Sequence, residues 1–424
     1  MVRNVFPEAM QQRALTVAES IVQQILEQIE KREEASSVSP RRPDPSIASG
    51  SSGRAVVLQY ALEALAGNSS WENAIHFCLR DAVEAAGTNP TGIELFKGLT
   101  GIAFAATATS CGGARYGKLL SSLVDRISSQ SALLAARIRS ANGLATADFD
   151  VISGLSGVVA FLLYARDRKL ATLTPALEAL VCLAGETGSL PRIHTPARLI
   201  VNSTMADTYQ AGYVNIGLAH GLPGPLAALS LALIQGVEVP GQRDAIRWYA
   251  DYLAAHQLAD SRNPQWPSAV SLDPNSGPMP PARLAWCYGA PGILRALYLA
   301  GVALGDRSCC EFASAALYRA IRNCPFGVNF PDPLCHGLAG ILAIVLRFCS
   351  EDTGSDWQSL RQDLLSKLTL NFQPAFPYGY ASLAHDGTRQ YQPALLDGAG
   401  GIALVLLSAS TAAPAWWDRL LLIA

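Results

Sequence analysis

Residues 335–346 read Cys-His-Gly-Leu-Ala-Gly-Ile-Leu-Ala-Ile-Val-Leu, a Gly-x-x-Gly step that runs directly into an apolar stretch. The same arrangement occurs seven times along the chain. The steps are Gly50–Gly53, Gly98–Gly101, Gly154–Gly157, Gly221–Gly224, Gly289–Gly292, Gly337–Gly340 and Gly398–Gly401. They recur every 50 to 70 residues or so, about the length of two helices and their loops, which indicates stacked supersecondary units.

Two kinds of helix are predicted around these steps. The segments after the steps are apolar on nearly all sides, which is typical of buried helices, and they span 55–65, 102–108, 158–163, 226–233, 293–304, 341–348 and 402–407. The segments before the steps are amphipathic, which is typical of half-buried helices, and they span 8–31, 72–86, 117–137, 174–184, 241–257, 309–322 and 356–370. This alternation predicts an all-α fold, a double-ring α/α toroid of about seven inner and seven outer helices. We expect one domain over residues 1–424, with 35–53 a loop and not an interdomain linker.

The composition narrows the class of protein. Half of the chain is apolar, 16% is charged and the net charge is −2, so the basic patch that nucleic acid would require is not indicated. The apolar runs are far shorter than the ~18 residues needed to span a bilayer, and the N-terminus has no apolar signal core. The nine cysteines are odd in number, and most lie in apolar helical surroundings, which argues against a disulfide framework. We therefore expect a cytoplasmic protein.

Cys287, Cys335 and His336 are the most informative side chains because of their place in the repeat. Each cysteine lies two residues before the first glycine of a step, and His336 follows Cys335 directly. Equivalent positions of neighbouring repeats should be close in space, so two thiolates and an imidazole are expected together. Three N/S ligands with no obvious fourth are typical of a catalytic zinc site with an open position. The alternative interpretation is that both thiols are buried core cysteines.

His220 occupies the position directly before the glycine in the fourth step, as His336 does in the sixth. A neutral imidazole there could act as general acid or base near pH 7. A helix-capping role and a role as fourth zinc ligand remain alternatives.

Arg283 and Asp150 are further candidates for the site. Arg283 lies four residues before Cys287 and could stabilise a developing enolate or oxyanion, or form a loop salt bridge. Asp150, four residues before Gly154, could orient His220 or Arg283, with Asp148 as a rival and helix capping as the alternative.

Tyr288 and Asp397 fill the position before the glycine in the fifth and seventh steps. The Tyr288 hydroxyl could donate a hydrogen bond, or the side chain could be purely structural. We rank Asp397 below Asp150, because its own loop could hold it as a cap.

Four motifs in order resemble the lanthionine synthetase C-like family, the cyclases of lantibiotic biosynthesis. They are Asp150-Val-Ile-Ser-Gly-Leu-Ser-Gly157, Asn215-Ile-Gly-Leu-Ala-His-Gly-Leu-Pro-Gly-Pro225, Trp286-Cys-Tyr-Gly-Ala-Pro-Gly292 and Cys335-His-Gly-Leu-Ala-Gly340. The resemblance covers the chain from about residue 40 to its end. It implies a helical toroid, one Zn²⁺ held by Cys287, Cys335 and His336, and an active site with His220, Arg283, Asp150 and Tyr288.

The resemblance also implies a reaction and partners. A precursor peptide with a leader segment arrives with Ser and Thr dehydrated, and its Cys thiolates add to the alkenes to form lanthionine and methyllanthionine rings. A dehydratase and an exporter are possible partners. Three other functions stay open: addition of glutathione to dehydrated residues, a zinc prenyltransferase, and a non-catalytic zinc-binding scaffold. The prenyltransferase is disfavoured, because its ligand set would include an Asp.

Overall fold

The fold was analysed in a computed structural model. The structure describes residues 8–35, 44–67, 69–88, 91–165, 170–259, 263–327, 329–352, 356–383 and 387–424. Residues 36–43 of the predicted loop 35–53 lie outside these ranges. Among the described residues, no helix is both long and apolar enough to cross a membrane.

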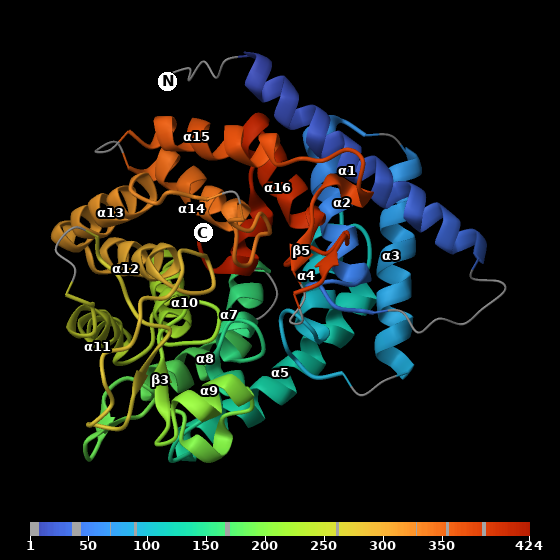
Figure 1. The fold of residues 1–424 in the computed structure, drawn as a ribbon. Helices are drawn as coiled ribbons and strands as arrows, with labels where there is room; N and C mark the ends of the chain where they lie inside the picture. Colours follow the sequence, from blue (N-terminus) through green and yellow to red (C-terminus); the bar gives the residue numbers. More distant parts are fainter. Residues whose placement is uncertain are drawn as a thin grey trace. The chain divides into compact units, whose positions relative to one another are not determined.

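The described chain is helical, with seven buried helices that each follow a glycine step (Figure 1). These inner helices are α2 (Ser51–Leu65), α4 (Leu99–Ala108), α7 (Leu155–Tyr164), α10 (Pro223–Ile234), α12 (Ala290–Leu304), α14 (Leu338–Glu351) and α16 (Ala399–Ser410). In α7 every side chain from Leu155 to Leu163 is buried, as predicted for an inner helix.

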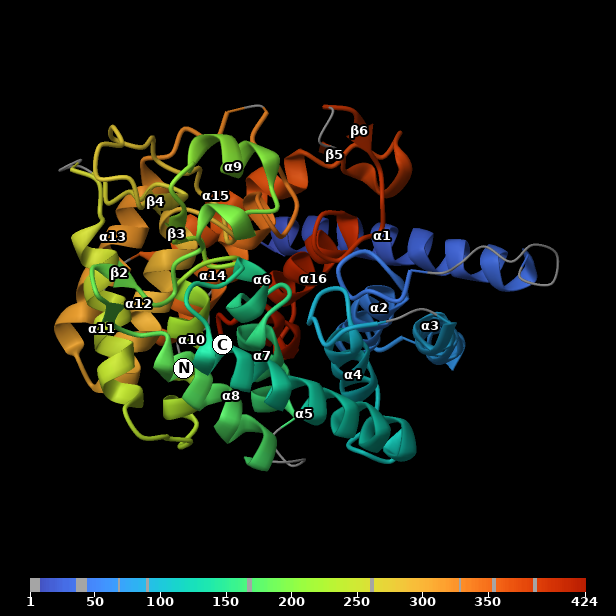
Figure 2. The same ribbon diagram turned by 90° about the horizontal axis from the view of Figure 1, so that it is seen from below.

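Seven further helices precede the steps, and each has both buried and exposed residues; they are labelled in Figure 2. They are α1 (Glu8–Ala35), α3 (Ser69–Thr88), α5 (Gly117–Ser140), α8 (Leu170–Cys182), α11 (Gln242–Ala255), α13 (Arg307–Arg322) and α15 (Trp357–Leu370). The short helices α6 (Thr146–Phe149) and α9 (Ser203–Thr208) lie in loops, as do the 3-10 turns at 197–199, 377–379 and 416–421. The predicted alternation of helix types is therefore confirmed.

Strands are confined to three short antiparallel pairs in the loops of the described chain. They are β1 (Glu186–Thr187) with β2 (Leu190–Pro191), β3 (Tyr213–Asn215) with β4 (Ala269–Ser271), and β5 (Ser382–Leu383) with β6 (Arg389–Gln390). The β3–β4 pair joins two of the long loops, with Asn215 opposite Ala269. Tyr213 of β3, Ala269 of β4 and the nearby Tyr209 form a small buried cluster.

The helices group into two compact units. Unit 1 comprises residues 1–92, 96–123 and 325–418, and unit 2 comprises 93–95, 124–324 and 419–424. Within unit 1, α16 packs against α1 and α2, so the last inner helix contacts the first. Within unit 2, α10 packs against α7 and α12, and α12 pairs with α13.

The inner helices begin earlier in the sequence than predicted and include part of each glycine step. All seven predicted inner helices begin after the second glycine of their step, but six of the seven helices in the structure begin at the residue after the first glycine. The second glycine therefore sits in the first helical turn. A Cβ on Gly157 would overlap the carbonyl oxygen of Val151 and lie 2.8 Å from the Leu95 Cβ. Close approach of backbone, and not an unusual dihedral angle, requires glycine there.

Replacing Gly157 with Ala should lower the free energy of unfolding by about 2–3 kcal/mol, because the added methyl must displace a backbone carbonyl. Urea denaturation followed by circular dichroism would measure the loss. Gly87→Ala is the matched control, since no atom lies within 4 Å of a Cβ at that helical position. Equal stabilities of the two variants would contradict the packing argument.

Candidate active site

Backbone hydrogen bonds join neighbouring loops at the positions that carry the candidate residues. In unit 2, Ala219 N–H donates to the Cys287 carbonyl over 3.2 Å, and Val151 N–H donates to the Ala219 carbonyl over 3.1 Å. In unit 1, Cys335 N–H donates to the Leu396 carbonyl over 2.9 Å. Cys335 and Leu396, like Ala219 and Cys287, are equivalent positions of neighbouring repeats and lie side by side, whereas Val151 bonds from one residue earlier in its own repeat.

Asp150 and His220 form a directly bonded pair in unit 2. The two atoms His220 Nδ1 and Asp150 Oδ2 are 2.7 Å apart. The other carboxylate oxygen of Asp150 accepts from the backbone N–H groups of Ser153, at 2.6 Å, and Gly154, at 2.9 Å. Asp150 is 1% exposed, whereas the His220 side chain is 40% exposed. Since a carboxylate only accepts, Nδ1 carries the hydrogen and Nε2 is left available on an accessible ring.

The rival carboxylate, Asp148, has a structural role. Its Oδ2 accepts from Ala145 N–H over 3.0 Å at the start of α6, and its other oxygen pairs with Arg137. Capping thus occupies Asp148, while Asp150 both closes its loop and holds His220.

Tyr288 lies beside His220, with the two ring centres 6.2 Å apart. Its hydroxyl accepts from Asn215 Nδ2 over 3.0 Å, and Asn215 Oδ1 accepts from Gly217 N–H at 3.0 Å. Burial raises the pKa of Tyr288 well above its ordinary value, so the phenol is a neutral donor at physiological pH. Asn215 was not among the predicted site residues, although it opens one of the quoted motifs.

Arg283 and Cys287 occupy the loop that precedes α12. The Arg283 side chain is exposed, and within the described residues it forms no hydrogen bond or ion pair. Cys287 is 6% exposed. The described residues provide neither the salt bridge that was the alternative role for Arg283 nor a contact between Arg283 and Asp150, so its guanidinium is available to a ligand.

Cys335, His336 and Asp397 form a cluster in unit 1 with the composition of a metal site. One ligand atom from each of the three lies within 4.8 Å of the others. His336 Nδ1 and Asp397 Oδ1 are 3.2 Å apart. Thiolate, imidazole and carboxylate are all zinc ligands, so the donor set fits Zn²⁺. Cys287 belongs to unit 2, and the complete Cys287–Cys335–His336 set stays a prediction.

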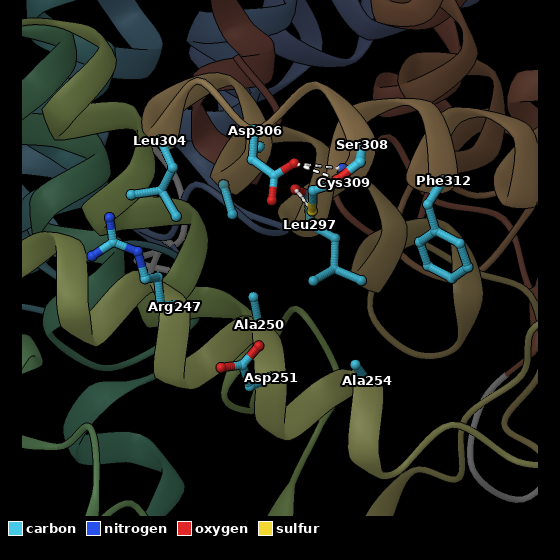
Figure 3. A pocket seen from close by; sticks show the side chains of 12 residues that line it. Arg247, Ala250, Asp251, Ala254, Leu297, Leu304, Asp306, Ser308, Cys309 and Phe312 are labelled. Atoms are coloured by element: carbon cyan, nitrogen blue, oxygen red, sulfur yellow. Dashed lines mark hydrogen bonds between the residues drawn. The ribbon is translucent and has the colours of Figure 1, made fainter.

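A separate cavity of about 320 Å³ lies between α11, α12 and α13 (Figure 3). It holds none of the candidate residues. Its thiol, Cys309, donates to the Leu297 carbonyl over 3.4 Å, and burial raises the pKa of Cys309 to about 11. A thiol with that pKa stays protonated near pH 7, so this cavity is not a nucleophilic site.

Comparison with known proteins identifies the family. A model of the lanthionine synthetase C-like family matches residues 42–422. The chain belongs to this family. Its sequence is 28% identical to the nisin biosynthesis protein NisC of Lactococcus lactis subsp. lactis over 207 residues, which are 47% of this chain and 49% of NisC. The aligned region thus spans about half the length of that relative.

The fold was compared with solved structures. The chain superimposes on nisin cyclase with a TM-score of 0.80 and 21% identity, covering 95% of this chain and 96% of nisin cyclase. This similarity confirms the predicted all-α toroid fold class.

The loop that carries Cys335 contains a carboxyl group whose ionisation should affect stability. Asp332 Oδ1 accepts from Asn371 Nδ2 over 2.7 Å. Burial raises the pKa of Asp332 to about 6, although the bond from Asn371 and the charge of Lys367 oppose this rise. Folding therefore favours the protonated form. Its stabilisation is complete below the unfolded pKa of 3.8 and is lost as pH rises through about 6.

Asp332→Asn keeps the accepting oxygen and removes this ionisation. Relative to the variant, the wild type should lose about 1–3 kcal/mol of unfolding free energy between pH 4.5 and pH 7.5. Urea denaturation of both proteins at the two pH values measures the difference. A difference that does not change with pH would show that Asp332 ionises normally in the folded protein.

Proposed function

We propose that this protein is a zinc-dependent lanthipeptide cyclase of the cytoplasm, folded as a single domain. Its substrate would be a precursor peptide, bound with its leader, in which Ser and Thr are already dehydrated. Each turnover would add a peptide Cys thiol across a dehydroalanine or dehydrobutyrine to give a thioether ring. The observation that carries this function is the Asp150–His220 pair, in which a buried carboxylate fixes an accessible imidazole. Membership of the lanthionine synthetase C-like family supports the same reaction.

Cys287, Cys335 and His336 would hold the Zn²⁺. The ion supplies one chemical function, which is to keep a peptide thiol in its thiolate form at neutral pH, where a free thiol of pKa ~8.5 is mostly protonated.

The remaining chemistry is proton transfer and charge stabilisation by the chain itself. The sulfur forms a bond to Cβ of the dehydrated residue, and the electrons of the alkene move onto Cα and the carbonyl oxygen. Arg283, exposed and without a protein partner among the described residues, is suited to stabilise the enolate oxygen. The thiol releases its proton to water, and His220 Nε2 takes up a proton from water and delivers it to Cα, so the reaction consumes no net proton.

Asp150 and Tyr288 have positioning roles in this proposal. Asp150 holds the hydrogen of His220 on Nδ1 and stabilises the imidazolium that forms between the two proton transfers. Tyr288, held by Asn215 beside the His220 ring, presents a neutral hydroxyl to the peptide. Partnership with a dehydratase and an exporter belongs to this proposal.

Asp150→Asn is the sharpest test of the acid/base pair. Asn keeps the oxygen that accepts from Ser153 and Gly154, but it places an NH₂ group opposite His220 Nδ1 and so favours the wrong tautomer. Cyclisation should fall by about 10²–10⁴, as should that of His220→Asn, with zinc content unchanged. His256→Asn is the matched control, since this histidine ends α11 and its side chain hydrogen-bonds only to the Tyr252 carbonyl in the described chain. Near-normal rates in both site variants would exclude this assignment.

Ring closure does not alter the mass of the peptide, so the assay counts free thiols by alkylation before mass spectrometry. Cys335→Ala should lose bound zinc and ring formation together. Cys182→Ala, at the exposed end of α8, should retain both. If dehydrated peptide gains the mass of glutathione and forms no rings, the protein is a glutathione-adding enzyme instead.

A further inference from the structure

The Asp397 carboxylate has a place in the repeat that brings it to His336. Asp397 precedes Gly398, the residue that caps α16 without a side-chain hydrogen bond. The bond from Cys335 N–H to the Leu396 carbonyl fixes the two loops in register one residue earlier. The side chains of the next residues, His336 and Asp397, therefore meet. All of these residues belong to unit 1.

The contact between the two side chains does not have the geometry of a hydrogen bond. Asp397 Oδ1 is buried and receives no hydrogen bond from the described residues, although His336 Nδ1 is 3.2 Å away. A buried carboxylate oxygen left without a partner costs about 1–3 kcal/mol or more, which calls for a partner outside the chain.

The same distance agrees with two ligands of one metal ion. Two atoms that each lie ~2.1 Å from a tetrahedral zinc are about 3.4 Å from one another. The Cys335 sulfur completes a set of three ligand atoms that all lie within 4.8 Å of one another. A favourable interaction with the N-terminus of α16 would explain a carboxylate in this loop, but it would not explain a buried oxygen directed at the imidazole.

We propose that Asp397 is a zinc ligand of the resting protein, together with Cys335 and His336, and that it is displaced by the peptide thiol. This inference rests on the metal site of the proposed function and adds its fourth ligand. Zinc prefers the softer thiolate over a carboxylate. Both ligands carry one negative charge, so replacing Asp397 with the peptide thiolate leaves the charge of the ligand set unchanged. The thiol proton passes to water, and the 46% exposed Asp397 side chain can move aside.

Metal affinity and ligand spectra test this inference without an activity assay. Asp397→Asn and Asp397→Ala should raise the zinc dissociation constant by about 10- to 100-fold, measured by competition with a chromophoric chelator. In the Co²⁺-substituted proteins the visible d–d bands should shift from those of the wild type. N-acetylcysteine, used as the probe thiol, should bind these Co²⁺ forms more tightly than the wild type, because no carboxylate has to leave.

The control is Asp356→Asn, which replaces another carboxylate directly before a helix of unit 1. Asp356 caps α15 by accepting from Ser359 N–H over 3.0 Å, and Asn caps equally well, so zinc affinity and spectrum should match those of the wild type. Unchanged circular dichroism of Asp397→Asn verifies that it folds.

Two negative results have different meanings. If Asp397→Asn matches the wild type in zinc affinity and Co²⁺ spectrum while Cys335→Ala loses zinc, Asp397 is not a ligand, and the proposed function stands. If Cys335→Ala and His336→Ala also retain full zinc affinity, the metal site itself is wrong, and the proposed function is overturned with this inference.

Discussion

Hydrogen bonds between the backbones of neighbouring loops are the constraint on which the rest of this structure depends. In unit 1 they run from Cys335 to Leu396, from Leu396 to Ala48 and from Ala48 to Phe96, and each of these residues lies two positions before a step glycine. Because these three bonds of unit 1 join equivalent positions, they fix each loop in register with the loop beside it. The glycines follow from this arrangement, since the chain must pass a loop carbonyl at a distance that excludes a Cβ.

The same constraint explains why a catalytic pair can form between residues far apart in the chain. Asp150 uses one oxygen to close its own loop and the other to hold His220, so its orientation is fixed twice. A carboxylate fixed in this way holds the imidazole without needing to rearrange during proton transfer. The buried Asp150 carboxylate positions the imidazole, and the exposed His220 ring is accessible to a substrate.

The repeat and its helices could be predicted from sequence because both depend on local pattern. The spacing of the glycines identifies the seven steps, and the hydropathy pattern identifies the two kinds of helix. The structure contains both. The exact start of each inner helix could not be predicted, because a Gly-x-x-Gly stretch is compatible with either a turn or a first helical turn. Asn215 was missed for a different reason: its partner, Tyr288, is 73 residues away, and nothing local marks an amide that bonds to a distant hydroxyl.

The sequence alone could not predict whether Asp397 is a helix cap or a metal ligand. The position before the glycine holds His220, Tyr288, His336 and Asp397 in the last four repeats, so its register was known, and a carboxylate before a helix is also a common cap. What distinguishes a cap from a ligand is whether the carboxylate oxygen is satisfied by N–H groups, and that depends on atoms in three dimensions. The loops are held by backbone hydrogen bonds and closely packed glycines. Neither depends on the side chain at the position before the step glycine. Chemistry can therefore differ from one repeat to the next at that position while the fold stays the same.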